Sequence, residues 1–212
     1  MLSLAFECAG QGLSAALAQD GELIDTTALA MDRGQPAALL PALHDLLDRR
    51  GLTGADVQRV GCTLGPGGFT GIRLGLSAAL GLARSSGAAF YGFNAFDVFA
   101  LAESDCRGLC IALESRRTEI FARIYDDSGN KLALNDAVMA PQQVQAQFRF
   151  SRVIGSAASK IRAEAVDAEP DMAVLARFMS ATTQGSPLLD QARDKTAPLY
   201  LRAPEIGGPA RP

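Results

Sequence analysis

The sequence predicts an α/β protein made of two related lobes. Two observations carry this prediction: a set of strands followed by helices occurs twice along the chain, and both sets open with short strands in a meander. The chain has 212 residues, of which 48% are hydrophobic, which is enough for an ordinary buried core. We expect the lobes at residues 1–103 and 104–203, followed by a loose tail at residues 204–212.

The first lobe opens with three short strands. They are expected at Leu2–Phe6, Leu13–Ala18 and Leu23–Leu29. The turn between the last two contains Asp20-Gly21, a dipeptide that favours hairpins because glycine accepts a positive φ. Leucines at helical spacing then predict a helix over Pro36–Arg50, and Gly51 is placed to end it. A fourth strand is expected at Arg59–Leu64.

A glycine-rich loop and an alanine-rich helix follow that strand, over Gly65–Ala83. If Thr70 is the N-cap, one face of the helix is almost bare backbone, because positions three and four apart are neighbours. The residues of this face are Gly71, Gly75, Ala78, Ala79 and Leu82. Leu74, Leu76 and Leu80 are expected to anchor the helix to its own sheet. Glycine inside a helix costs about 1 kcal/mol relative to alanine, so the bare face indicates close packing, either within the domain or against another subunit.

The remaining elements complete the first lobe and build the second. After a turn at Ser85-Ser86-Gly87, a strand and a helix are expected at Ala88–Gly92 and Ala95–Ala102. The second lobe is expected to contain strands at Leu109–Leu113, Glu119–Tyr125, Lys131–Leu134 and Arg152–Gly155, with helices at Pro141–Phe148 and Asp171–Thr182.

Composition excludes several classes of function. The net charge is −3 and basic residues are scattered, so no nucleic-acid footprint is present and any contact with RNA is expected to be indirect or shared. No segment approaches the roughly 18 apolar residues of a membrane span, and we expect a cytoplasmic protein. The four cysteines are predicted to be reduced, without a zinc site. The single histidine, His44, lies on the leucine-rich helix and is interpreted as a solvated or half-buried side chain.

The glycine loop could also hold a phosphate, because a strand, a glycine loop and a helix in that order point backbone N–H groups at an anion. The known motifs are not satisfied, however. A Walker loop needs Gly-Lys-Ser/Thr where this chain has Thr70-Gly71-Ile72-Arg73, and a dinucleotide fingerprint needs glycine in place of Thr70. What remains is a possible vestigial phosphate site at Glu7, Gly67, Gly68 and Thr70.

The stretch GPGGFTGIRLGLSAALGLA resembles the signature of the TsaB (YeaZ) family of bacterial tRNA threonylcarbamoyladenosine (t6A) biosynthesis subunits, whose usual form is close to GPGSFTGLRIG. Other blocks resemble the family in the same order. They are LSLAFECAGQGLSAAL, RGQPAALLPALHDLL, IALESRRTEIFARIYD and PLYLR. The resemblance therefore covers roughly residues 2–202.

This resemblance implies an actin-like ATPase fold (ASKHA, ribonuclease H-like), with a mixed sheet and helices in each lobe. It implies a non-catalytic scaffold that binds and activates the larger paralogue TsaD, which carries the metal and transfers threonylcarbamoyl to an adenosine beside the anticodon. The ATPase TsaE joins the complex, tRNA is met through the complex, and isolated subunits form homodimers. No cofactor is expected on this chain, whereas ATP and a metal ion are expected in the partners. The partner contact is expected at Gly71, Ile72, Gly75, Ala78, Ala79 and Leu82.

The chain also departs from the family pattern. Glu7 stands where the first strand usually ends in Ile-Asp-Thr-Ser, and Gly68 replaces a usual serine. With only His44, the chain cannot build the paralogue's metal-binding pair of histidines. The alternative readings are a small actin-fold ATPase or phosphotransferase that uses Glu7 and the Gly65–Thr70 loop, and a homodimeric regulator. Arg116-Arg117 could position RNA or a partner, or form a solvated hairpin turn.

Overall fold

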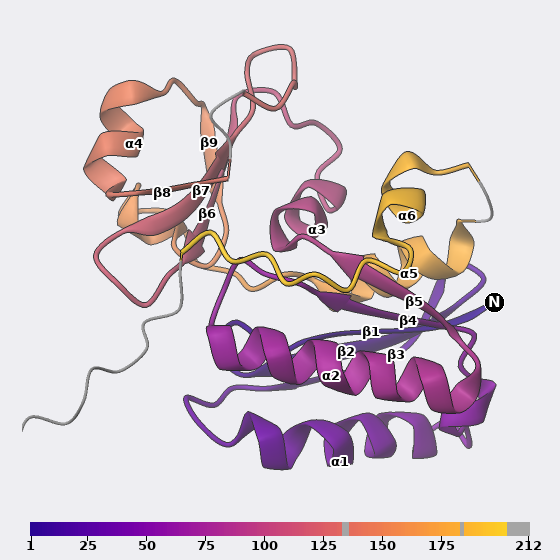
Figure 1. Cartoon of the computed structure of the whole chain (residues 1–212). Helices are drawn as coiled ribbons and strands as arrows, with labels where there is room; N and C mark the ends of the chain where they lie inside the picture. The colour runs from indigo at the N-terminus through magenta and orange to yellow at the C-terminus, as the bar shows by residue number, and fades with distance from the viewer. Residues whose placement is uncertain (133–135, 183–184, 203–212) are drawn as a thin grey trace, which may run out of the picture.

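The computed structural model describes residues 1–132, 136–182 and 185–202, and their strands form two separate sheets (Figure 1). The first sheet has the order β3-β2-β1-β4-β5. Its strands are β1 (Leu2–Glu7), β2 (Leu13–Gln19), β3 (Glu22–Leu29), β4 (Arg59–Thr63) and β5 (Ala89–Phe93). β1, β2 and β3 pair antiparallel, whereas β4 runs parallel to both β1 and β5. The sheet is therefore mixed, as predicted.

The hairpin between β2 and β3 turns at the predicted dipeptide. Asp20 and Gly21 both have positive φ, at 53° and 91°. This is the geometry of a tight turn that matches the twist of its strands, and glycine adopts it without steric cost.

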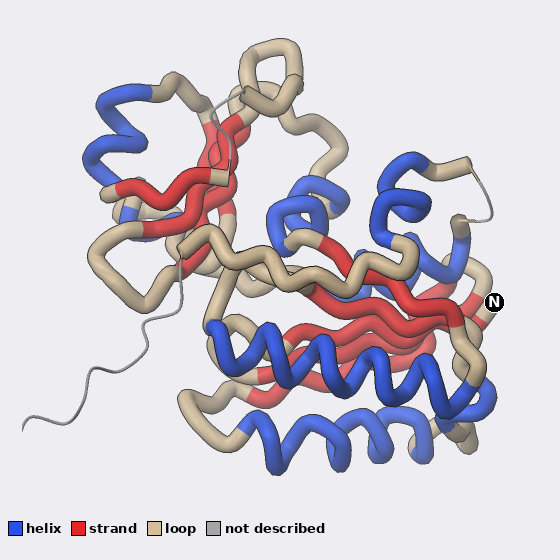
Figure 2. The backbone as a smooth tube through the Cα atoms, in the orientation of Figure 1, coloured by secondary structure: helices blue, strands red, loops and turns tan. Residues whose placement is uncertain are grey.

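Helices cover both faces of the first sheet (Figures 1 and 2). On one face lie α1 (Gln35–Asp48) and α2 (Phe69–Ser86), which share a core with Leu4, Phe6 and Val60. On the other face lie α5 (Met172–Ala181) and α6 (Pro187–Ala192). A short 3-10 helix, η1 (Gly54–Asp56), precedes β4.

The second sheet has the order β8-β7-β6-β9. Its strands are β6 (Leu109–Glu114), β7 (Ile120–Ile124), β8 (Ala137–Met139) and β9 (Arg152–Ile154). One face packs against α3 (Ala95–Leu101), and the other packs against α4 (Pro141–Gln147) and the segment around the 3-10 helix η2 (Ala158–Lys160). β6 is antiparallel to β7 and parallel to β9, so this sheet is mixed too.

Two predicted details need correction or stay open. The third strand of the second lobe is β8, not Lys131–Leu134; Lys131 makes only an isolated bridge to Tyr125, and residues 133–135 lie outside the described residues. The division near residue 103 stays a prediction, although α5 and α6 return from the later part of the chain to pack on the first sheet. The predicted tail at 204–212 also lies outside the described residues.

An ion-paired arginine joins the two halves. Arg123 on β7 is almost wholly buried, and its Nε donates to Asp136 Oδ1 at 2.6 Å. A second ion pair reaches Asp97 on α3, and the guanidinium lies 4.8 Å from the centre of the Phe96 ring. α3 leaves the first sheet directly after β5, so this cluster fixes the second sheet to the end of the first.

None of the helices in the described part of the chain is long and apolar enough to cross a membrane.

Candidate functional site

The glycine loop places the start of α2 directly against the end of β1. Gly68 N donates a hydrogen bond to the Ala9 carbonyl at 2.8 Å. A Cβ added to Gly71 would lie 2.0 Å from the Cys8 carbonyl oxygen, and one added to Gly67 would lie 2.8 Å from the Ala9 Cβ. These glycines therefore serve contacts inside the protein's own first lobe, where no side chain has room.

The inward face of α2 is rotated from the one that spacing alone suggested. Ile72, Leu76, Ala79 and Ala83 are buried at positions that recur every three or four residues. The exposed fractions of Ile72 and Ala79 are 1% and 0%, so neither side chain is free to contact a partner. Leu76 anchors the helix to its own sheet, as predicted, whereas Ile72 and Ala79, which were predicted on the partner face, are buried on the same inward side.

Of the predicted contact residues, Ala78 and Leu82 are half-buried at the rim of that inward face, and their role stays a prediction. Gly75 is buried, yet a Cβ added there would meet nothing within 4 Å outside the backbone of its own helix. The side of α2 turned away from the sheet, called here the outer face, carries exposed Thr70, Arg73, Ser77 and Gly81. Leu74 is half-buried beside them.

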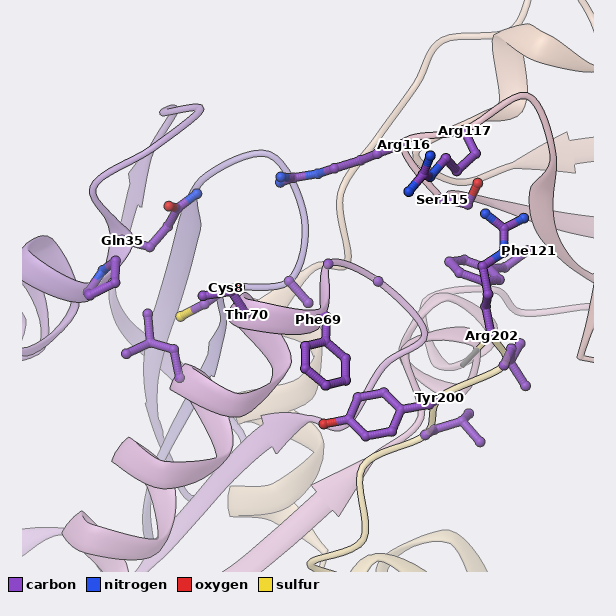
Figure 3. Close-up of a pocket in the computed structure, with 18 residues that line it drawn as sticks. Cys8, Gln35, Phe69, Thr70, Ser115, Arg116, Arg117, Phe121, Tyr200 and Arg202 are labelled. Carbon is purple, nitrogen blue, oxygen red and sulfur yellow. The ribbon is translucent and has the colours of Figure 1, made fainter. Parts of the chain in front are cut away.

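A cavity of about 310 Å³ opens between the two lobes at this end of α2 (Figure 3). Its walls come from the glycine loop, the first turns of α1 and α2, the β6–β7 turn and the segment at 199–202. The parallel strands β1 and β4 end here, and such carboxyl ends are where open α/β sheets form ligand crevices. We call it the interlobe cavity.

Positive charge dominates the wall of the interlobe cavity. Arg116, Arg117 and Arg202 line it, and none of the described residues that line it is an aspartate or a glutamate. Arg116 reaches across to the first lobe, where its Nη2 donates to the Gly10 carbonyl at 3.0 Å (Figure 3). Arg202 Nη2 lies 2.9 Å from Glu119 Oε2, which is outside the lining.

An aromatic pair forms another part of the wall. The rings of Phe69 and Tyr200 lie with their centres 4.6 Å apart (Figure 3). Arg73 stacks 3.8 Å from the centre of Phe69 and donates its Nε to the Tyr200 hydroxyl at 3.1 Å. This cluster ties the extended segment after α6 to the start of α2. The sequence singled out PLYLR only as an expected ending, so the part that Tyr200 and Arg202 play in this cavity was missed.

Glu7 lies apart from the interlobe cavity. Gly67, Gly68 and Thr70 line that cavity, whereas Glu7 lines a smaller adjoining pocket together with Gly67 and Glu169. The four residues of the predicted vestigial phosphate site are thus neighbours, but Glu7 does not share one chamber with all the others.

The surroundings of the Glu7 carboxyl group disfavour negative charge. Its Oε1 accepts hydrogen bonds from Ala9 N and from Gly10 N, the latter at 2.8 Å, whereas its Oε2 is buried without a partner. Burial, followed by the nearby Glu169 carboxylate, raises the pKa of Glu7 to about 7, against the two backbone hydrogen bonds. Once Glu7 is ionised, it and Glu169 would repel a phosphate placed beside them.

The other candidate groups lie away from the site, apart from Cys8, which lines the interlobe cavity. His44 is exposed on α1, and all four cysteines are free thiols, of which Cys106 alone is not buried. Within residues 1–132, 136–182 and 185–202, no three histidine, cysteine or acidic side chains are grouped so that they could hold a metal ion.

A family model described as "TsaD: tRNA N6-adenosine threonylcarbamoyltransferase" matches residues 32–186, which is most of the chain. The chain therefore belongs to the TsaD family. Within this family it is similar to the tRNA threonylcarbamoyladenosine biosynthesis protein TsaB of Escherichia coli K12, with 26% identity over 155 residues, 70% of this chain and 67% of that protein. TsaB of Bacillus subtilis 168 is 24% identical over 126 residues, 59% of this chain and 55% of that protein.

The solved structures agree on the fold. YeaZ from Pseudomonas aeruginosa superposes with a TM-score of 0.71 at 22% identity, over 94% of this chain and 99% of that one. The resemblance to TsaB and YeaZ predicted from the glycine loop is confirmed, and so is the actin-like α/β fold with two mixed sheets.

Proposed function

We propose that this chain takes part in t6A biosynthesis as a non-catalytic subunit that binds and activates a TsaD partner through the outer face of α2. The similarity to TsaB proteins supports the process, since their name assigns them to it. The observation that supports the docking surface is that the outer face of α2 carries an exposed glycine, Gly81, where an added Cβ would meet nothing within 4 Å outside its own helix.

Another glycine of α2, Gly71, has different surroundings. Gly71 must be glycine because Cys8 and Ala9, directly after β1, occupy the space a Cβ would need. Exposed Gly81 has open space there, so it weakens the isolated helix by about 1 kcal/mol relative to alanine, and no contact within the described chain offsets this cost. Close approach of a partner helix offsets this cost, because bare backbone allows van der Waals contact along the length of the helix.

The non-catalytic part of the proposal rests on the interlobe cavity. Its wall offers arginines, aromatic rings and backbone amides but no carboxylate among the described residues, and the only histidine of the sequence lies on α1 outside it. The metal ion and ATP are then supplied by the partners, TsaD and TsaE, and tRNA is met through the assembled complex. The isolated chain forms homodimers through the same face, in the cytoplasm.

Gly81→Leu is expected to weaken binding of TsaD at least tenfold, about 1.4 kcal/mol, because the added side chain holds the two helices apart. Titration of the purified chains by calorimetry measures this. Ala146→Leu, which places the same bulk on an exposed position of α4, is the matched control and should leave affinity unchanged. Unchanged affinity in Gly81→Leu with intact circular dichroism would refute the docking surface.

Gly81→Ala is expected to stabilise the isolated chain by about 1 kcal/mol, since the helix gains propensity and the methyl group enters open space. Urea unfolding followed by circular dichroism measures the change. Gly71→Ala is the opposite case and should destabilise, because its methyl group collides with the Cys8 carbonyl. Equal effects of the two substitutions would show that the surroundings of Gly71 and Gly81 do not differ as described.

Reconstitution tests the role in the pathway. The full set of t6A components should modify tRNA only when this chain is present, and the chain alone should show no turnover of ATP. Modification at full rate without the chain would overturn the proposal.

A further inference from the structure

We propose that the interlobe cavity receives an acidic side-chain segment of the protein that docks on the outer face of α2. This inference rests on the proposed function, since it names the chemistry of that same partner at a second point of contact. Three observations lead to it: the charge of the cavity, its continuity with the docking face, and the uncapped start of α2.

The charge of the cavity selects an anion. Three guanidinium groups line this cavity of about 310 Å³, and no carboxylate of the described residues lines it. The Arg116 guanidinium donates to the Gly10 carbonyl and the Arg202 guanidinium pairs with Glu119, and each of these planar groups carries five N–H donors. Guanidinium groups bind carboxylates through paired, charge-assisted hydrogen bonds, so an acidic side chain matches this wall.

The cavity is continuous with the proposed docking face. Thr70 and Leu74 belong to α2 beside its exposed outer positions, and both also line the cavity. Gln35 and Pro36, at the start of α1, form the adjoining rim. A partner helix lying on this end of α2 would therefore also contact the wall of the cavity.

The start of α2 adds N–H donors that attract an anion, as the arginines do. The N-cap residue is Gly68, which has no side chain to cap the helix. The first N–H groups of a helix lack partners within it and carry partial positive charge, which favours a carboxylate next to them. Here the helix end and the three arginines converge on one cavity, so the two contributions act on the same group.

The wall favours a peptide over a nucleotide or RNA. Polyphosphates normally bring Mg²⁺ held by carboxylates, and the described lining offers none. RNA would need an extended basic stripe, whereas this charge is confined to a cavity between two lobes. Phe69, Phe121 and Tyr200 supply apolar surface for the aliphatic stem of a glutamate.

The experiment measures the affinity of the full chain for TsaD by calorimetry at 50 mM and 300 mM NaCl. Arg116→Gln and Arg117→Gln are each expected to weaken binding about tenfold at the lower salt concentration and to reduce the loss of affinity caused by salt. Arg116→Lys and Arg117→Lys should recover part of the affinity because they keep the charge. Arg149→Gln, an exposed arginine outside the cavity, is the matched control and should change nothing.

The outcomes separate this inference from the proposed function. If Gly81→Leu abolishes binding while both glutamine variants bind like the unchanged chain, the acidic contact is refuted and the docking face stands. If neither kind of variant affects binding, both proposals fail. A third arm titrates the isolated chain with inorganic pyrophosphate and with single-stranded RNA. If either binds, loses its affinity in both glutamine variants and leaves TsaD binding unaffected, the cavity serves that ligand instead, and the inference is overturned.

Discussion

Replacing Arg123 by methionine is expected to lower the free energy of unfolding by about 3–5 kcal/mol, the usual cost of removing one partner from a buried ion pair. The guanidinium is 3% exposed and pairs with Asp97 and Asp136. Without it, Asp97 loses this ion pair in a partly buried space, and Asp136 keeps only the exposed Lys131, whose Nζ lies 3.3 Å from Asp136 Oδ2. The Arg123 charge and hydrogen bonds hold the pKa of Asp136 below its usual value against the effect of burial, so the loss is felt at neutral pH.

Urea unfolding at pH 7 measures this effect, and two further variants interpret it. Arg152→Met removes an exposed arginine that pairs with Glu103 at 2.7 Å, and it should cost less than about 1 kcal/mol. Asp97→Asn combined with Arg123→Met should recover part of the stability, because one of the stranded charges is gone. A loss in Arg123→Met no larger than in Arg152→Met would show that the buried cluster does not hold the lobes together.

The Arg123 cluster could not be predicted from the sequence. Arg123 appeared only as a polar residue inside a strand, and its partners lie 26 and 13 residues away along the chain. Spacing within one element says nothing about such a contact. The strands were easier to predict from the sequence, because β1, β2 and β4 are runs of buried residues bounded by turn residues. They lie within a residue or two of the predicted limits.

The helix after the glycine loop shows the same limit in another form. Its existence follows from its composition, although it begins at Phe69 with Gly68 as the N-cap and not with the predicted Thr70. Two of its stripes are apolar enough to face a sheet. One contains Leu74 and Leu80, and the other contains Ile72 and Ala79. Only the position of the sheet decides between them, and the backbone of Cys8 and Ala9 beside Gly71 selects the second. The interlobe cavity could not be predicted from any single segment, because its walls come from residues as far apart in the sequence as Ala9 and Arg202.

Glu7→Gln is expected to remove a stability loss that the unchanged chain suffers as the pH rises. The ordinary pKa of 4.5 is raised to about 7 in the folded protein, first by burial and then by Glu169. Between these two values the folded state keeps a proton that the unfolded state has released. Stability contributed by this group is therefore present below pH 4.5 and is lost as the pH rises through 7. The shift corresponds to a loss of about 3 kcal/mol.

Glutamine keeps one acceptor oxygen for the Ala9 and Gly10 N–H groups but cannot ionise, so it should behave like protonated Glu7 at every pH. Unfolding free energies measured from pH 4.5 to 8.5 should agree for the two proteins at the acid end and differ by about 3 kcal/mol, in favour of Glu7→Gln, at the alkaline end. Glu164→Gln, at an exposed position, should follow the unchanged chain throughout. Parallel profiles for Glu7→Gln and the unchanged chain would refute the raised pKa.

The consequence reaches the interlobe cavity through the turn that Glu7 organises. Gly68 bonds to the Ala9 carbonyl and Arg116 to the Gly10 carbonyl, and the Glu7 carboxyl group holds the N–H groups of these same two residues. Ionisation above pH 7 leaves a negative charge buried at this turn, and movements that bring this charge to solvent should loosen both the glycine loop and Arg116. If the acidic contact of the partner is made there, affinity for TsaD should fall at alkaline pH in the unchanged chain and stay level in Glu7→Gln.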